Sequence, residues 1–395
     1  MDRTQRLAAD IFISELMLDG VLRGNQIRHM IKDGYISRLR DIYTSTEWVG
    51  RLEKKGHCIS QQLRQELGGQ IRKNYAQKTA EEMAAAGMFS FSLQDPEYPE
   101  RLKPISGMPI ILYGMGDIRS IHAADIPVVA WVGTRRPSMY GLKVTEEAVK
   151  KLCESRVCIV SGLARGIDTK AHRTTLREGG RTVAVMAGGL DQVYPPENED
   201  LFKQIKETGC VLSELPPKRK PLRQFFPARN RILSGLSDAV VIAEAGEHSG
   251  ALHTASYAAS QGRDVFAVPG NIYSNRSNGC HMLLKDGAEI FLDAEDVLER
   301  LASLHFYRTV DAVRFSREKK RGAEPSGENR TLPFENEGGS DRRSRLLDCI
   351  CSEDKSMDAL LEELGMPFQE TALILAELEL SGRIAEIDGK YTYIY

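Results

Sequence analysis

Short apolar segments alternate with amphipathic segments between residues 126 and 301, and this alternation limits the fold more than any other feature of the chain. Each apolar segment has the length and continuity of a strand that is buried on both faces of a parallel sheet. Helical patterns lie between them, which predicts right-handed crossovers and a doubly wound, mostly parallel sheet of the α/β class. The predicted strands are 126–132, 157–160, 182–187, 211–212, 239–243 and 264–268, and the predicted helices are 140–153, 169–178, 199–208 and 251–261.

The segments before this α/β domain, which we place at 126–302, have a different character. Residues 1–85 carry apolar side chains at helical spacing between glycine-containing breaks, and they predict a helical domain. Residues 86–125 contain prolines at positions 96, 99, 104 and 109, and they predict an irregular connector.

Two further regions follow the α/β domain. Residues 303–343 are polar and rich in Gly, Pro and Ser, a composition typical of a flexible linker. Residues 344–395 contain three short helical patterns and two alternating runs that are joined by Asp388-Gly389, a strong hairpin signal. Three helices and a hairpin predict a winged-helix domain.

The bulk composition excludes several classes of protein. The longest apolar runs are far shorter than the roughly 18 residues of a membrane helix, and the first residues lack a secretory pattern. Seven cysteines without a CxxC pair favour reduced thiols, so we expect a cytoplasmic protein that does not contact the membrane. The net charge of −2 means that any affinity for nucleic acid must come from a local patch.

Glycines and small polar residues follow four of the predicted strands. Because the carboxyl ends of parallel strands share one edge of a sheet, we expect these loops to lie together, near the point where the strand order reverses. Glycines let a phosphate approach the backbone, and hydroxyl groups and the N–H groups of a helix start can donate to it. The candidates are Gly133 and Thr134, then Ser161, Gly162, Arg165 and Gly166, then Gly188 and Gly189, and finally Ser249 and Gly250.

A basic segment with aromatic residues precedes the strand 239–243. It has no acidic residue between 216 and 231, and Phe226 lies among its cations. A basic groove with an aromatic face is the usual means of binding single-stranded nucleic acid, whereas Lys218–Lys220 alone would be a solvated face. The cations are Lys218, Arg219, Lys220, Arg223, Arg229 and Arg231, with Asn230 between the last two.

Cofactor-dependent and catalytic chemistry finds little support in the sequence. The loop after the first strand is GTRRPS rather than GxGxxG, so we expect no dinucleotide cofactor. Metal-binding, Walker A and nucleophile-elbow motifs are missing, and Asp168, His172, His248 and His253 have no partner at a diagnostic spacing. We therefore predict a protein without catalytic residues, bound metal or cofactor.

Seven blocks between residues 90 and 300 carry a family resemblance: VGTRRPSMYG, SGLARGID, GGLDQVYPPEN, FPARNRILSGLS, SGALHTA, GRDVFAVPG and NGCHMLLKDGA. In this order they resemble the DprA (Smf) family of DNA-processing proteins. The resemblance implies an extended Rossmann-like fold that binds single-stranded DNA without sequence preference. It also implies a homodimer that loads the recombinase RecA onto incoming DNA during natural transformation. Members often carry an N-terminal helical (SAM-like) domain and a C-terminal winged helix.

The resemblance also assigns particular residues. The arginine of the family's first glycine loop falls on Arg135, the aromatic residue of its F-P-x-R-N-R motif on Phe226, and the basic residue three positions earlier on Arg223. We expect these side chains to hold phosphates and to stack on a base, together with the loops above. The complete predicted set is Gly133, Thr134, Arg135, Ser161, Gly162, Arg165, Gly166, Arg223, Phe226, Arg229, Asn230, Arg231, Ser249 and Gly250.

Two alternatives remain open. A nucleotide-processing enzyme of the phosphoribohydrolase kind has a related glycine loop, but here the stretch AGEHSGALHTA lacks the glutamate that follows that loop. A winged-helix regulator of duplex DNA is disfavoured because the candidate recognition helix, 368–380, has no Lys or Arg. We expect the acidic winged helix to pack on a protein instead.

Overall fold

The computed structural model describes residues 1–54, 61–119 and 126–304, together with parts of 346–393. The chain forms two compact units, Met1–Glu318 and Lys319–Tyr395. Most of the predicted linker and most of the helix predicted at 368–380 lie outside the described residues.

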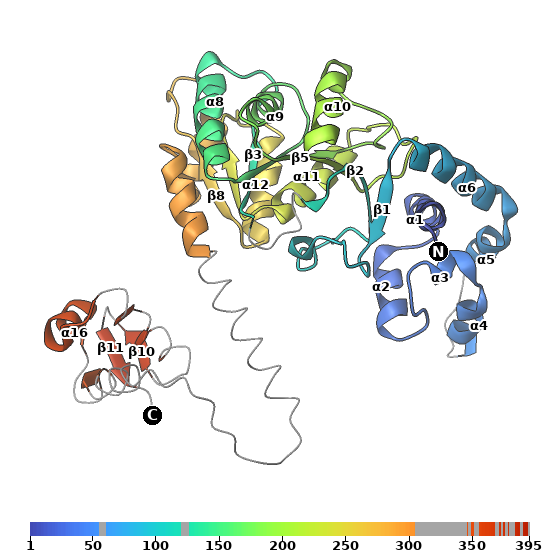
Figure 1. The fold of residues 1–395 in the computed structure, drawn as a ribbon, viewed down its shortest axis with the longest axis horizontal. Coiled ribbons are helices and arrows are strands. Elements are labelled where there is room, and N and C mark those ends of the chain that lie inside the picture. Colours follow the sequence, from blue (N-terminus) through green and yellow to red (C-terminus); the bar gives the residue numbers. More distant parts are fainter. Residues whose placement is uncertain are drawn as a thin grey trace, which may run out of the picture. The chain divides into compact units, whose positions relative to one another are not determined.

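A nine-stranded sheet forms the centre of the first unit (Figure 1). Its strand order is β1-β2-β6-β5-β4-β3-β7-β8-β9, and all neighbouring strands from β6 to β9 are parallel. β1 and β2 pair antiparallel to each other, and β2 pairs antiparallel to β6. The strands are β1 (Phe89–Ser92), β2 (Ile111–Gly116), β3 (Val128–Val132), β4 (Cys158–Ser161), β5 (Thr182–Met186), β6 (Cys210–Ser213), β7 (Ala239–Ile242), β8 (Asp264–Ala267) and β9 (Glu289–Ile290).

All six predicted strands exist, and the α/β fold class is confirmed. The strands from β3 to β7 are short, mostly apolar runs because both of their faces are covered, whereas β8 begins with the half-buried Asp264 and Val265. The prediction of an irregular connector is wrong at two places, because β1 and β2 lie within 86–125 and extend the sheet beyond β6. Prolines flank these two strands without interrupting them.

Helices cover both faces of the sheet, and alternate residues of β3 show the two sides. Val129 and Trp131 pack with α8, α9 and residues 291–301, whereas Ala130 packs with α11 and α12. α10 lies on the same side as α8 and α9 (Figure 1). The helices are α8 (Met139–Glu154), α9 (Ile167–Arg177), α10 (Glu199–Thr208), α11 (Phe225–Leu236), α12 (Ala251–Ser260) and α13 (Asn278–Lys285), with 3-10 turns at Glu100–Leu102 and Pro196–Asn198.

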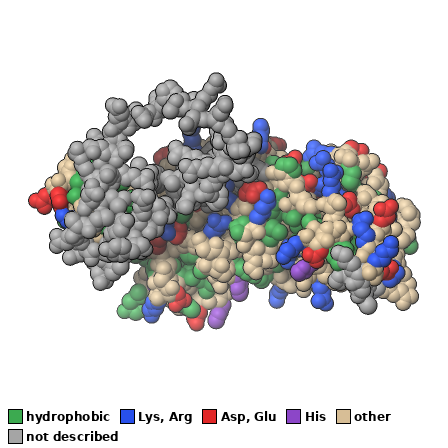
Figure 2. All heavy atoms as spheres, turned by 90° about the horizontal axis from the view of Figure 1, so that it is seen from below, with side chains coloured by type: hydrophobic (Ala, Val, Ile, Leu, Met, Phe, Trp, Pro, Cys, Tyr) green, Lys and Arg blue, Asp and Glu red, His purple; other side chains and the backbone are tan. Residues whose placement is uncertain are grey.

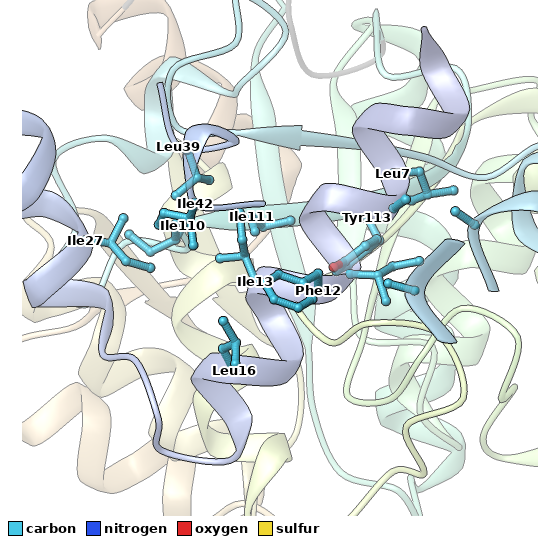
Figure 3. Close-up of a cluster of buried hydrophobic side chains, with 14 of the residues drawn as sticks. Leu7, Phe12, Ile13, Leu16, Ile27, Leu39, Ile42, Ile110, Ile111 and Tyr113 are labelled. Carbon is cyan, nitrogen blue, oxygen red and sulfur yellow. The ribbon is translucent and has the colours of Figure 1, made fainter. Parts of the chain in front are cut away.

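The N-terminal helices pack around α1, whose side chains enter one core with the edge of the sheet. Phe12 of α1 lies beside Tyr113 of β2 in this core, which Ile13 and Ile111 share (Figure 3), and the Tyr113 hydroxyl donates to Ser14 Oγ at 2.8 Å. Asp2 caps α1 through a capping box with Gln5. The helices are α1 (Arg3–Leu18), α2 (Gly24–Lys32), α3 (Asp41–Thr44), α4 (Glu47–Lys54), α5 (Gln61–Gly68) and α6 (Gln70–Ala85).

The second unit contains α16 (Met357–Leu364) and an antiparallel hairpin of β10 (Ile384–Ile387) and β11 (Lys390–Tyr393). The predicted hairpin strands are confirmed. Ser356 caps α16 and Gly365 ends it in the left-handed conformation. Throughout the described ranges of both units, every helix is too short or too polar to cross a bilayer.

Candidate functional site

A cleft of about 530 Å³ opens where the order of the parallel strands reverses. β3 lies between β4, which follows it in the chain, and β7, which begins the other half of the sheet. The loops after β3 and β7 leave the sheet at this point and diverge, as expected at a switch point. The cleft is lined by residues 132–136, Ala164, Asp168, Phe226, Pro227, Arg229, Asn230, Leu233, Gly246, residues 248–251, His253 and Thr254.

α11 forms one wall of this cleft. Sequence reasoning missed the helix and treated its residues only as a motif before β7. Buried or cleft-facing side chains nevertheless recur at positions 226, 229, 230, 233 and 236, which is helical spacing. Pro227 is tolerated because it lies in the first turn, where its missing N–H would have no partner within the helix.

Phe226 is the centre of the site. The ring is partly buried, and the guanidinium carbons of Arg135 and Arg229 lie 5.1 Å and 6.0 Å from its centroid. Tyr194 contacts it edge to face, with ring centroids 6.0 Å apart. A second, smaller hollow lies beside Phe226, bordered by Tyr194 and Pro221. The predicted meeting of Arg135, Phe226 and Arg229 on one edge of the sheet is confirmed.

Arg229 lies buried next to the Phe226 ring. Its side chain is buried and donates to the carbonyls of Gly162 and Val185 and to Asn230 Oδ1. Burial lowers the pKa of Arg229 to about 10, and the nearby carboxylate of Asp168 opposes this effect. Because most of its N–H groups donate within the fold, Arg229 has few left to bind a phosphate. Its main contribution is positive charge beside the Phe226 ring. This revises the predicted role.

Arg135 contrasts with Arg229, because it is exposed. Within the described ranges its side chain has no ion pair, and its recorded contact is the cation–π contact with Phe226. Arg136 is also exposed at the cleft, and Arg223 is exposed just before α11. Basic and acidic side chains are interspersed on the face shown in Figure 2, and Arg135 and Arg136 are the exposed cations that the cleft itself presents.

Two groups that were predicted to contact a ligand, the Ser161 hydroxyl and the Gly162 N–H, make hydrogen bonds within the fold instead. Ser161 is fully buried and donates to the Trp131 carbonyl at 2.6 Å, which corrects the prediction that its hydroxyl contacts a ligand. Gly162 donates its N–H to Asp168 Oδ2 at 3.1 Å. The first residues of this loop are therefore held by Asp168, and burial raises the pKa of that carboxyl group.

Two predicted arginines are held in ion pairs. Arg231 pairs with Glu214 at 2.6 Å and is not part of the cleft wall. Two residues along a helix differ by about 200°, so Arg231 lies on the side of α11 opposite to Arg229. Arg165 pairs with Glu197 and borders the smaller hollow. The prediction that Arg231 holds a phosphate is corrected on this ground.

The remaining predicted residues shape the loops. Gly166 has a φ of +79°, and a Cβ there would lie 2.4 Å from the Thr134 carbonyl oxygen, so only glycine allows this loop to pack against the loop after β3. Gly133 and Thr134 line the cleft, and the Thr134 N–H donates to the Glu244 carbonyl at 2.7 Å.

The start of α12 forms the opposite wall. Ser249 and Gly250 line the cleft there, and Asn230 Nδ2 donates to the Gly250 carbonyl at 3.2 Å, which ties α11 to α12. His248 and His253 also line this wall. Sequence reasoning passed over both histidines because no catalytic partner was near; their place beside the glycine loop was the available signal.

Comparison with known proteins agrees with this architecture. Residues 90–302 match the family described as DNA recombination-mediator protein A, and residues 331–390 match the DprA winged helix domain. The chain belongs to the DprA family. It is 44% identical over 209 residues to the DNA processing protein DprA of Streptococcus pneumoniae, a match that covers 53% of this chain and 73% of that protein.

Other members of the DprA family extend the comparison. Protein Smf of Escherichia coli is 36% identical over 296 residues, covering 74% of each chain, and a 40% identical match spans 64% of Protein Smf from Synechocystis. The X-ray structure of DprA from Streptococcus pneumoniae superposes with a TM-score of 0.53 at 36% identity, over 64% of this chain and 90% of that one. The chain thus has the DprA fold and a C-terminal winged-helix domain.

Proposed function

We propose that this protein binds single-stranded DNA, without sequence preference, across the cleft at the switch point. The observation that carries the proposal is the Phe226 ring, which lies beside the guanidinium groups of Arg135 and Arg229 at the mouth of a nucleotide-sized cleft. An aromatic face accepts any base, and exposed cations beside it attract the phosphates, which is the arrangement that sequence-independent binding needs.

The proposed contacts differ in strength. Stacking on one aromatic ring contributes about 1–3 kcal/mol per base, so Phe226→Ala is expected to weaken binding roughly 5- to 150-fold. Arg135→Ala removes one exposed phosphate contact. Neither substitution deletes a fully buried side chain.

Binding of a fluorescent, unstructured deoxythymidine oligonucleotide tests the proposal. Arg173→Ala is the matched control for Arg135→Ala, because Arg173 is an exposed arginine on α9 away from the cleft lining. Phe226→Trp retains an aromatic face and should keep most of the affinity that Phe226→Ala loses. Equal affinities for wild type, Arg135→Ala and Phe226→Ala would exclude the cleft as the DNA site.

We further propose that the protein acts in the cytoplasm without catalysis, by protecting incoming single strands and loading RecA onto them. Membership of a recombination-mediator family supports this role. The test is RecA filament formation on DNA that is coated with a single-strand-binding protein, with and without this protein. Incubation with nucleotides should release no free base; release would favour the phosphoribohydrolase alternative.

We also propose a homodimer that uses the β9 end of the sheet. β9 is a terminal strand of the sheet, and Ile290 within it and Leu292 just after it are exposed, with 49% and 70% of their surface accessible. Exposed apolar side chains beside an unpaired strand edge favour association. Light scattering should give twice the chain mass for the wild type and a lower mass for Leu292→Glu.

A further inference from the structure

The loop between β6 and α11, residues 214–224, carries most of the basic run of the sequence and leads directly into Phe226. Pro221 of this loop borders the smaller hollow beside that ring. Any cation of the loop that is free therefore lies close to the path proposed for DNA. The cations of the loop are Lys218, Arg219, Lys220 and Arg223.

Lys218 is engaged by helix α6 of the N-terminal region. Its Nζ lies 2.8 Å from Glu82 Oε2 and 5.8 Å from the centroid of the Tyr75 ring. The ammonium group lowers the pKa of the Glu82 carboxyl group, mainly by this hydrogen bond. The charge of Lys218 is therefore paired with Glu82 and contacts the Tyr75 ring, both on α6.

Arg219 is engaged by helix α1. It forms an ion pair with the buried carboxylate of Glu15, and its Nη2 lies 3.7 Å from Asp19 Oδ1. The backbone is also fixed here, because the Arg219 carbonyl accepts the Gly189 N–H at 2.8 Å and the Lys218 N–H donates to Asp191 Oδ1 at 2.8 Å.

The other two cations of the loop are different. Lys220 and Arg223 are both exposed, and across the ranges that the structure describes neither side chain has a recorded ion pair or hydrogen bond. The basic run is thus divided into a half that the N-terminal helices neutralise and a half that stays available to solvent.

We infer that the N-terminal helices limit how many phosphates the protein holds, because Glu82, Glu15 and Asp19 keep Lys218 and Arg219 out of the DNA-binding surface. This inference rests on the proposed function. It gives the N-terminal helical region a role in DNA binding without contact with DNA: its acidic side chains determine which cations of the loop reach the strand.

Glu82→Gln tests the inference, with Glu81→Gln as a closely matched control. Both glutamates are exposed neighbours on α6, but Glu81 accepts from Gln77 rather than from a cation. One additional phosphate contact steepens the slope of log K against log salt by about 0.7. The ratio of the Glu82→Gln affinity for single-stranded DNA to the wild-type affinity should therefore be about five times higher at 0.1 M salt than at 1 M salt.

A second substitution isolates the cation responsible. Lys218→Ala should change affinity little in the wild type, where Lys218 is engaged, and should abolish the gain in the Glu82→Gln background. The inference fails if Glu81→Gln and Glu82→Gln alter the slope equally, or if Lys218→Ala weakens the wild type as strongly as it weakens Glu82→Gln.

These outcomes are separable from the proposed function. If Phe226→Ala lowers affinity while the Glu82 variant behaves as its control, only the inference about the N-terminal helices is overturned. If Phe226→Ala and Arg135→Ala leave binding unchanged, the cleft itself is not the DNA site, and the inference falls with it.

Discussion

The salt dependence of DNA binding follows from the cations that the structure leaves free near the cleft. Arg135, Arg136, Lys220 and Arg223 are exposed and form no ion pair within the described ranges, whereas Arg231 is paired with Glu214. Four phosphate contacts at about 0.7 each give an expected slope of about −2.8 for log K against log salt, per protomer. Raising the salt concentration from about 50 to about 200 mM should then weaken binding about 50-fold.

Fluorescence anisotropy of a labelled oligodeoxythymidine, measured at five or more salt concentrations, gives this slope. Arg135→Ala should flatten it by about 0.7, because one contact is lost. Arg231→Ala should leave it unchanged, since the Arg231 guanidinium faces Glu214. A slope near zero, or equal flattening by the two substitutions, would refute the assignment of the contacts.

Three further predictions concern the fold around the cleft and the second unit. Burial, together with the positive charge of Arg229, lowers the pKa of His172 to about 3 in the native state. Below about pH 6.5 the unfolded chain therefore binds a proton on this histidine that the native state does not bind, and the folded protein loses stability as the pH falls. Urea unfolding should show about 2 kcal/mol of this loss between pH 7 and pH 5, and His172→Gln should remove it; an unchanged pH profile in that variant would contradict the account. Gly166→Ala should abolish DNA binding and lower Tm, because a side chain at this left-handed position collides with the Thr134 carbonyl; a variant with wild-type Tm would show that the loop adapts. Deletion of 341–395 should change affinity for single-stranded DNA less than about tenfold by anisotropy, because segment 368–380 carries acidic residues and no Lys or Arg, and like charge repels the phosphates. A larger loss at unchanged oligomeric state would show that the winged helix binds DNA.

The strands and the position of the site could be predicted from the sequence because both depend on local patterns. Strands that are covered on both faces must be apolar runs, and β3, β5 and β7 are. Glycine loops after them fix the edge where the cleft opens. α11 was missed because its polar motif residues hide a helical period, and β1 and β2 were missed because prolines flank them.

The assignment of individual arginines could not be made from the sequence. Arg229 and Arg231 look equivalent along the chain, but the helix places one beneath the cleft and turns the other toward Glu214. Similarly, Lys218 and Arg219 read as free cations because Glu82 and Glu15 are more than a hundred residues away in the chain. Charge at a site depends on tertiary partners, and these are invisible to a local pattern.

The two-sided character of α11 has a consequence for mutagenesis libraries. Phe226 and Pro227 are partly exposed and border the cleft, whereas Ile232, Gly235 and Leu236 pack into the core. Random variants of this segment should therefore fall into two classes that alternate with the helical period. Substitutions at the cleft-facing positions should give well-expressed chains that no longer retain DNA, and substitutions at the core-facing positions should give chains that do not accumulate. The DNA affinity of this protein can therefore be engineered only at the cleft-facing positions of α11.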